Sequence, residues 1–423
     1  MKRYILVSTL ILLGGIWCKK PEEKVLARVG EEKITVGEFR RALPPRADSA
    51  LKERILESMI QRALFACEAK KRGMDKDPAI EKEFNQRKRD VIVRALYREV
   101  VTKRVKVFEH EIKDAYKILG EELKLRLILL KDKDKAKEVF SEIKKGTPFK
   151  DIATKYSEDP SSRRGGDIGW IPLLWAKGDF PGVEKLKKGE VSKLIKTPRG
   201  FVIIKVEDKR TQKKRSLEEE KSRIKEILRA QKSQRLAQKF LEKIRSGVSY
   251  NPEAIKILSK PPDSLKPGDL EVWVAKKGKL VFKIKDIQPQ LRRMMFIPEE
   301  EAVKQIVDQE LLYREAEKRG LEKRKETQED LAQLMNSILF QKLYREEVLF
   351  RLSVTDEEVA SYYEEHKKDY PNKTLEDVKA SIRNRLRSEK RRRRLEEYTD
   401  RLKAKYKVEV NRTLLSQIEP EER

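Results

Sequence analysis

Apolar residues recur at helical spacing through most of the chain. Between residues 51 and 64 they follow one another at steps of three and four, which places them on one stripe of an α-helix: Leu51, Ile55, Leu56, Met59, Ile60, Ala63 and Leu64. Gly73 then stands where a helix favours glycine as its C-terminal cap. A short apolar run before this helix, at residues 25–30, is typical of a small extended element.

The helical pattern is present twice. Residues 59–73 align without a gap with residues 306–320, at a spacing of 247. The same spacing relates several later positions: residues 96–99 to 343–346, Val107 to Val354, and Tyr116 to Tyr363. Beyond these the spacing falls to 158, relating Leu217, Lys221 and Ile224 to Leu375, Lys379 and Ile382. The first copy therefore carries an extra segment of 89 residues, about one small domain, that the second copy lacks.

The extra segment has the pattern of an α+β domain. Residues 123–130 alternate apolar and charged side chains before ending apolar, which predicts a half-buried strand. Two apolar helix stripes follow, around Val139 and Ile152. At the end of the segment, residues 191–196 and 201–206 flank a turn whose second residue is Pro and whose fourth is Gly. We therefore expect a compact domain that ends in a hairpin.

Together these patterns predict a mostly α fold with one α+β domain. We expect a first helical module at residues 25–119, completed by residues 210–250, with the inserted domain at residues 120–209. Residues 251–269 contain four prolines and a glycine and are expected to be a linker. The second, related helical module would then comprise residues 270–423.

The N-terminal residues have the pattern of an export signal. Lys2 and Arg3 precede an apolar run that ends before Cys18, and this run is shorter than the ~20 residues that a membrane-spanning helix needs. We therefore expect a signal peptide at residues 1–17 and a tether at residues 18–24. A Cys directly after such a run resembles the lipobox of bacterial lipoproteins, which implies lipidation of Cys18, although Trp17 stands where a small residue is usual. Plain secretion and an uncleaved anchor stay open as alternatives.

Composition makes the chain strongly basic. It has 100 Lys and Arg against 72 Asp and Glu, for a net charge of +28, so anionic surfaces of any kind will attract it. The densest basic run, residues 390–394, is flanked by glutamates and is interpreted first as the solvated face of a helix. Membrane-surface binding is the next interpretation, and nucleic-acid binding is the least favoured. Cys67 lies in a helical stretch and is expected to be a small core residue.

Spaced motifs in the inserted domain carry a family resemblance. They are Tyr156-Ser157-Glu158-Asp159, Gly165-Gly166-Asp167-Ile168-Gly169-Trp170, Phe180, Gly189-Glu190-Val191-Ser192, and the run from Gly200 to Val206. This combination resembles the parvulin-type (PpiC) peptidyl-prolyl isomerase over residues 120–209. Two SurA-N-like helical modules around such a domain are similar to the exported chaperone-isomerases SurA, PpiD and PrsA. The resemblance implies a folding factor in the cell envelope, either in a periplasm or on the outer face of a membrane, whose partners are unfolded or nascent exported proteins.

The resemblance also assigns site positions. It places Asp159 at the Cys or Asp position of the parvulin site, Ile168 and Phe180 in the pocket for the proline ring, and Ala176 where Met is common. Arg199 stands at a position that is usually Ser, and with Ile168, Ala176 and Phe180 it is expected to bind the peptide. Both of the usual site histidines are replaced, one by Leu127 and the other by Val202. The two histidines of the chain, His110 and His366, lie outside this domain, and a surface position is expected for His110.

These replacements shape the functional hypotheses. Prolyl isomerisation has a barrier of ~20 kcal/mol that arises from amide resonance, and it requires no cofactor, metal or nucleotide. We expect a chaperone that binds unfolded exported polypeptides, with an isomerase domain that is weak or inactive. An active prolyl isomerase is the alternative, because a dry pocket and Asp159 remain. Asp159 could equally do no more than cap the turn before Pro160. A basic scaffold for membranes or nucleic acid is the third hypothesis.

Overall fold

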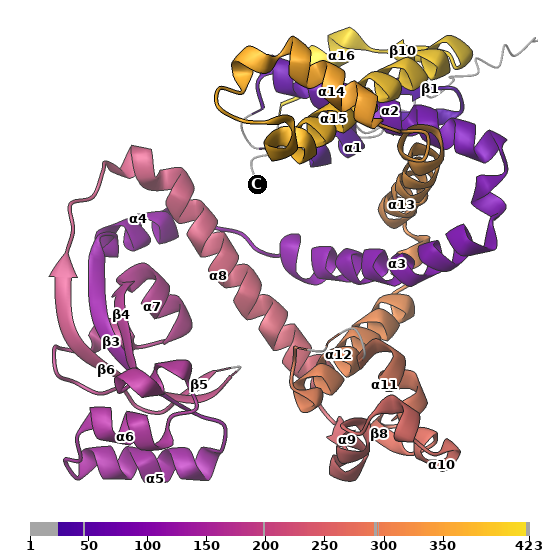
Figure 1. The fold of residues 1–423 in the computed structure, drawn as a ribbon. Coiled ribbons are helices and arrows are strands. Elements are labelled where there is room, and N and C mark those ends of the chain that lie inside the picture. Colours follow the sequence, from indigo (N-terminus) through magenta and orange to yellow (C-terminus); the bar gives the residue numbers. More distant parts are fainter. Residues whose placement is uncertain (1–23, 45–46, 198, 292–293, 295, 420–423) are drawn as a thin grey trace, which may run out of the picture. The chain divides into compact units, whose positions relative to one another are not determined.

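The computed structural model describes residues 24–419 except residues 45–46, 198, 292–293 and 295 (Figure 1). The expected signal peptide and Cys18 lie outside these residues. Two compact units form: unit 1 comprises the chain up to Ile92 and from Glu322 onward, and unit 2 comprises Val93–Leu321. The fold is mostly α with one α+β domain, as the sequence predicts. None of the described helices is both long enough and apolar enough to cross a membrane.

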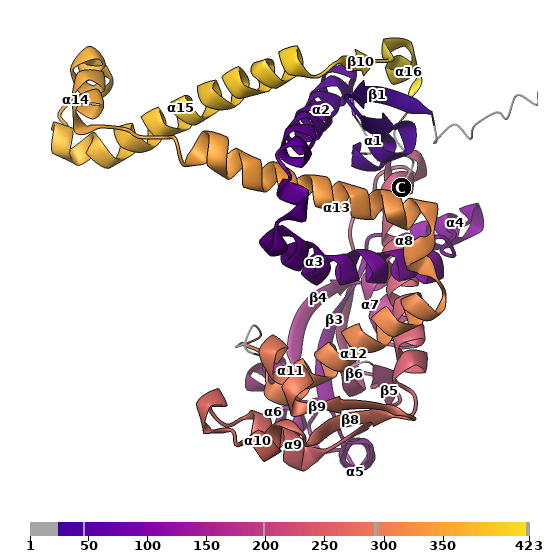
Figure 2. The ribbon, with the colours of Figure 1, turned by 90° about the vertical axis from the view of Figure 1, so that its right-hand side faces the viewer.

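Unit 1 is a small sheet covered by long helices. The sheet has the strand order β10-β1-β2 and is antiparallel throughout. Its strands are β1 (Val25–Val29), β2 (Glu32–Thr35) and β10 (Val408–Val410). The helices are α1 (Val36–Ala42), α2 (Ser49–Lys71), most of α3 (Pro78–Tyr97), α13 (Lys325–Tyr344), α14 (Asp356–Glu365), α15 (Leu375–Lys405) and α16 (Arg412–Gln417). Figure 2 shows α14 against the end of α15 that lies away from this sheet.

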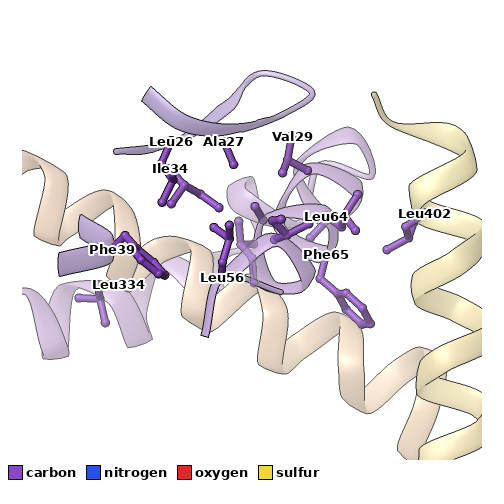
Figure 3. Packing of buried hydrophobic residues seen from close by; sticks show 14 of the residues in the cluster. Leu26, Ala27, Val29, Ile34, Phe39, Leu56, Leu64, Phe65, Leu334 and Leu402 are labelled. Atoms are coloured by element: carbon purple, nitrogen blue, oxygen red, sulfur yellow. The ribbon is translucent and has the colours of Figure 1, made fainter. Parts of the chain in front are cut away.

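The core of unit 1 forms where the sheet, α2, α13 and α15 meet. Leu26 of β1, Phe39 of α1 and Leu64 of α2 are fully buried there (Figure 3). Phe65 of α2 packs between α13 and α15, with its ring 5.0 Å from that of Phe340 and 5.2 Å from that of Tyr398. The apolar stripe that the sequence shows on α2 is therefore covered by helices from the other end of the chain.

Unit 2 contains a second small sheet of the same design. Its order is β7-β8-β9, and again all pairs are antiparallel. The strands are β7 (Ser249–Tyr250), β8 (Trp273–Lys277) and β9 (Leu280–Lys283). The helices of unit 2 outside the inserted domain are the end of α3, α4 (Glu109–Ile118), α8 (Leu217–Arg245), α9 (Pro252–Leu258), α10 (Pro267–Leu270), α11 (Ile284–Leu291) and α12 (Glu299–Lys318).

The duplication seen in the sequence extends to whole elements. Helices α3 and α13 are offset by 247 residues at both ends, and so are α4 and α14. A π-helical turn follows α3 at Arg98–Thr102, and another follows α13 at the equivalent residues Arg345–Leu349. The long helices α8 and α15 begin 158 residues apart. Each copy therefore folds into the same series of elements.

The two copies exchange their final segments. Strand β10 of the second copy completes the sheet that β1 and β2 of the first copy begin, and β7 of the first copy completes the sheet of β8 and β9. The expected grouping, with residues 25–119 completed by 210–250 and a separate module at 270–423, therefore differs from the observed units. The segment 251–269 is also more than a linker, because Ala254 and Leu258 of α9 are buried in the core of unit 2. The repeat shows which segments are equivalent, but it does not show which copy supplies the last strand of each sheet.

The inserted domain is a four-stranded antiparallel sheet with helices on both faces (Figure 1). The strand order is β4-β3-β6-β5, and the strands are β3 (Glu121–Leu130), β4 (Asp167–Pro172), β5 (Ile195–Thr197) and β6 (Gly200–Thr211). Helices α5 (Lys133–Lys144) and α6 (Phe149–Tyr156) share an apolar cluster with one face, and α7 (Leu173–Asp179) shares another with the opposite face. Residues 120–209 thus have a hydrophobic centre of their own.

Candidate functional site

The candidate site lies on the face of the inserted sheet that α7 covers. Leu127 of β3 and Val202 of β6 are 5% and 3% exposed. Both belong to the apolar cluster that includes Ala176 of α7, and Ile168 of β4 and Phe180, the cap residue of α7, pack against this cluster. The structure therefore brings together all five residues for which the sequence predicts a pocket role or a replaced histidine.

The exposure of these residues decides what the face can do. Leu127, Val202 and Ala176 are buried, whereas Ile168 and Phe180 are half-buried and keep part of their surface open to solvent. An apolar ligand group can therefore contact Ile168 and Phe180 while the layer beneath them stays dry. Because Leu127 and Val202 have no polar side-chain atoms, this layer supplies no hydrogen bond and no proton.

Asp159 has a structural role. It is the N-cap of a short 3₁₀ helix at Pro160–Arg164, with Pro160 at the first helical position. Its Oδ1 accepts a hydrogen bond from the backbone N–H of Ser161 at 2.9 Å, and its Oδ2 accepts one from Nη2 of Arg199 at 2.8 Å. The carboxylate thus caps the turn, as one of the two sequence interpretations expects, and also ties that turn to the β5–β6 hairpin that carries Arg199.

The charge state of Asp159 follows from these contacts. Burial of this carboxyl, which is 9% exposed, raises its pKa, but the hydrogen bonds from Ser161 and the guanidinium of Arg199 outweigh burial and hold the pKa below its ordinary value. Asp159 is therefore ionised at neutral pH and accepts hydrogen bonds without donating one. A general-acid role at neutral pH does not fit this state.

Ser161 is a site residue that the sequence reasoning does not single out. Its side chain is 4% exposed, and its Oγ is buried beside the carboxylate of Asp159. The only sequence signal is its place two residues after Asp159, where the backbone N–H of a capped turn is expected. Ser161 therefore adds a hydroxyl beside the carboxylate of Asp159.

The loop between α6 and β4 is held in place by Arg126 and by a glycine. Arg126 of β3 donates to the carbonyls of Arg164 and Gly165 at 3.1 and 2.9 Å, and to Glu207 at 3.0 Å. Gly166 has a φ of +79°, and a Cβ there would lie 2.6 Å from the carbonyl oxygen of Leu127. Only glycine lets this loop approach β3 so closely, which keeps Asp159 and Ser161 beside the sheet.

The other candidates lie away from this site. His110 of α4 is exposed and stacks on Phe108 at 5.8 Å, as the expected surface position requires, and His366 stacks on Tyr362 at 4.0 Å. The basic run at residues 390–394 lies within α15, where Lys390 pairs with Glu358 and Arg394 donates to the carbonyl of Glu347 at 2.7 Å.

Comparison with known proteins agrees with this geometry. Residues 115–210 match the model of the PPIC-type PPIase domain family. A probable parvulin-type peptidyl-prolyl cis-trans isomerase from Bordetella bronchiseptica is 32% identical over 191 residues, and the match covers 43% of this chain and 74% of that protein. The chain belongs to the parvulin family.

Other parvulin-family relatives resemble this chain beyond the isomerase domain. The foldase protein PrsA from Geobacillus kaustophilus is 30% identical over 239 residues, which cover 53% of this chain and 84% of PrsA. The chaperone SurA from Pseudomonas aeruginosa is 29% identical over 213 residues, covering 45% of this chain and 51% of SurA. Each of these matches is longer than the inserted α+β domain, so each also includes part of the helical modules.

Proposed function

We propose that this chain is an extracytoplasmic folding factor that binds unfolded exported polypeptides, and that its parvulin domain isomerises prolyl bonds weakly or not at all. One observation carries the proposal: Leu127 and Val202, which the family resemblance places at the positions of the two usual site histidines, are both buried in an apolar cluster. A domain with this face has apolar surface for a peptide but lacks the polar network beside it.

The chemistry of the remaining groups supports this division between binding and catalysis. Twisting an X-Pro bond removes amide resonance, so a site accelerates the reaction if it binds the twisted bond better than the planar one. Ile168 and Phe180 offer contacts to a proline ring that hardly change as the bond rotates. Asp159 is ionised and already accepts hydrogen bonds from Ser161 and Arg199. The face therefore offers few groups that would bind the twisted bond better than the planar one.

The folding role is carried over from relatives. PrsA is named a foldase and SurA a chaperone, and both names support a role in protein folding. The charged n-region, the short apolar run and Cys18 of the sequence agree with export. Attachment to a membrane through a lipidated Cys18 is part of the proposal.

Suppression of aggregation tests the chaperone role. The mature chain is mixed at stoichiometric amounts with an exported protein diluted from denaturant, and light scattering is followed. We expect scattering to fall with increasing chain, and to fall similarly for the variant Asp159→Ala. An unchanged scattering curve at stoichiometric amounts would overturn the chaperone role.

The second candidate function is an active isomerase, which the half-exposed Ile168 and Phe180 favour. It requires that the chain accelerate cis-to-trans conversion of an X-Pro peptide and that Phe180→Ala or Asp159→Ala remove the acceleration. A rate equal to that of buffer alone eliminates this candidate and leaves the chaperone role intact.

A further inference from the structure

The middle of α15 is exposed and strongly basic (Figure 2). The earlier part of this helix packs on α14 and its later part packs on α2, but no residue from 383 to 397 is buried. Residues 383–394 include eight Lys or Arg and one Glu. This stretch of unit 1 therefore has cationic surface that is available to a partner outside the chain.

The basic side chains of this stretch divide into two groups. Lys390 and Arg394 are held inside unit 1, by α14 and by the π-turn after α13. Arg387, Arg391 and Arg392 are exposed, and in the part of the chain that the structure describes their guanidinium groups form no ion pair and no hydrogen bond. Arg387 and Arg391 are four residues apart on one face of the helix, where like charges destabilise it. An anion bound beside them would relieve this repulsion.

A cavity of about 520 Å³ lies beside two of these arginines. Its lining combines the two guanidinium groups with polar and apolar side chains: Arg391, Arg392, Ser388, Glu389, Leu395 and Tyr344 of α13. Tyr344 and Leu395 are half-buried. The carboxylate of Glu389 is paired with Arg385 at 3.1 Å. The cavity therefore offers unpaired positive charge next to apolar surface.

The equivalent place in unit 2 has neutral residues instead of these two arginines. The spacing of 158 between α8 and α15 places Ser233 and Gln234 at the positions of Arg391 and Arg392. A cavity of about 650 Å³, with Gln234 in its lining, lies there too. The cavity thus belongs to the repeated fold, whereas its two unpaired arginines are specific to unit 1.

We propose that Arg387, Arg391 and Arg392, the α15 arginine cluster, bind the phosphate headgroups of an anionic membrane surface. A guanidinium group binds phosphate oxygens through two parallel N–H donors, and it is hydrated more weakly than an ammonium group. The apolar surface of Tyr344 and Leu395 suits the glycerol and first methylene groups that a lipid phosphate carries and a free phosphate lacks. Positive side chains close to an anionic bilayer each add to its attraction for the protein.

The proposed lipid tether would bring this cluster close to a membrane, and for this step the inference rests on the proposed function. Lys24 directly precedes β1, β1 pairs with β10, and β10 follows the end of α15. The six residues from Cys18 to Lys24 reach at most ~20 Å. The helix rises only ~21 Å between Arg391 and Lys405. A lipid chain and a basic patch together hold a protein at a membrane more stably than one chain alone does.

Vesicle flotation tests the proposal. The full mature chain carries Cys18→Ser, so that no lipid is attached, and is mixed with vesicles of phosphatidylcholine alone or of an equimolar mixture with phosphatidylglycerol. We expect binding to the anionic vesicles that weakens as salt rises, and little binding to the neutral ones. Arg391→Ser combined with Arg392→Gln installs the residues of the sister helix and should weaken binding about tenfold or more. Lys239→Ser combined with Lys243→Gln removes the same charge from exposed positions of α8 and should leave binding nearly unchanged.

The other outcomes separate this cluster from competing explanations. Equal binding of the wild type and the Arg391/Arg392 variant would overturn the proposal, and so would an equal loss in the Lys239/Lys243 variant, because net charge alone would then account for binding. Inorganic phosphate at the phosphate concentration of the vesicles should not displace the chain, and complete displacement would assign the cluster to a free anion. A variant that loses binding to single-stranded RNA but keeps binding to vesicles would assign it to nucleic acid instead. Aggregation suppression in solution should be the same in all forms, so a failure of the chaperone role is seen separately.

Discussion

At the scale of single residues, the parvulin domain places a hydrogen-bonded turn beside an apolar face. Gly166 and Arg126 hold the loop that carries Asp159, and Asp159 caps the turn that follows. Leu127 and Val202, by contrast, join the apolar cluster beneath the face. This face therefore offers a ligand apolar contacts, and the charged Asp159 beside it is held by the turn and by Arg199.

The Asp159–Arg199 contact predicts a measurable pKa change. Because Arg199 lowers the pKa of Asp159, Arg199→Ala should raise it toward the ordinary value of about 4, although the Ser161 hydrogen bond remains. A carboxyl-carbon NMR titration checks this, with Arg163→Ala, on the same turn, as a control of equal charge. The ionised carboxylate should stabilise the domain at neutral pH, and this stabilisation should be lost as pH falls through the lowered pKa. An unchanged Asp159 pKa in Arg199→Ala would contradict the assignment.

Leu127 is buried in the core of the parvulin domain. Leu127→Ala removes buried methyl groups from the centre of a cluster, so we expect the domain to lose about 2–5 kcal/mol of unfolding free energy. Hydrogen exchange of β3 and β6, read by mass spectrometry, measures the loss. Lys209→Ala, at an exposed position of β6, should cost little. Equal exchange rates in the two variants would show that Leu127 does not support the fold.

At the scale of elements, much of the architecture could be predicted from apolar spacing. The stripe of α2, the strand at residues 123–130 and the insertion between the spacings of 247 and 158 are all present in the structure. The exchange of β7 and β10 between the copies could not be predicted, because equivalent helices present equivalent apolar faces. The π-turns after α3 and α13 were also missed, since an added residue per turn leaves no distinct pattern in a helical stretch.

Reciprocal ion pairs accompany this exchange. Arg72 of the first copy binds Glu347 of the second at 2.7 Å, and Arg319 of the second binds Glu99 of the first at 2.8 Å. The carboxylate partners of Arg72, Glu68 and Glu347, are both 7% exposed, whereas Glu99 is 22% exposed. The arrangement is the same in both units, but its burial is deeper in unit 1.

This difference in burial predicts that replacing Arg72 or Arg319 by Ala destabilises the two units unequally. Arg72→Ala removes the cation that two buried carboxylates share, and among the described residues Glu68 keeps only Lys405 and Glu347 only Arg351 as a charged partner, so unit 1 should lose about 1.5–3 kcal/mol of unfolding free energy. Arg319→Ala affects Glu99 and Glu315, whose side chains are 22% and 24% exposed, and should destabilise unit 2 by less. Hydrogen exchange of α13 and α15 in the first variant, and of α8 and α12 in the second, measures both effects. A larger loss in Arg319→Ala would contradict the role of burial.

At the scale of the whole molecule, the chain combines partly exposed apolar residues, such as Ile168 and Phe180, with a net charge of +28. Long-range attraction acts mainly on the rate of encounter, whereas contacts made after docking set the rate of dissociation. We therefore expect the association rate with an acidic unfolded client to fall as salt rises, and the dissociation rate to change little. Stopped-flow fluorescence measures both rates. An association rate that does not depend on salt concentration would contradict a role of the net charge in the encounter.

The most direct test of the central claim is an NMR exchange measurement on an X-Pro peptide in the presence of the chain. Shifted peptide resonances report binding, and the cis–trans exchange rate in the same sample reports catalysis. The account predicts shifted resonances with an exchange rate close to that of the free peptide. Exchange that is accelerated by orders of magnitude, and returned to the free rate by Phe180→Ala, would contradict it.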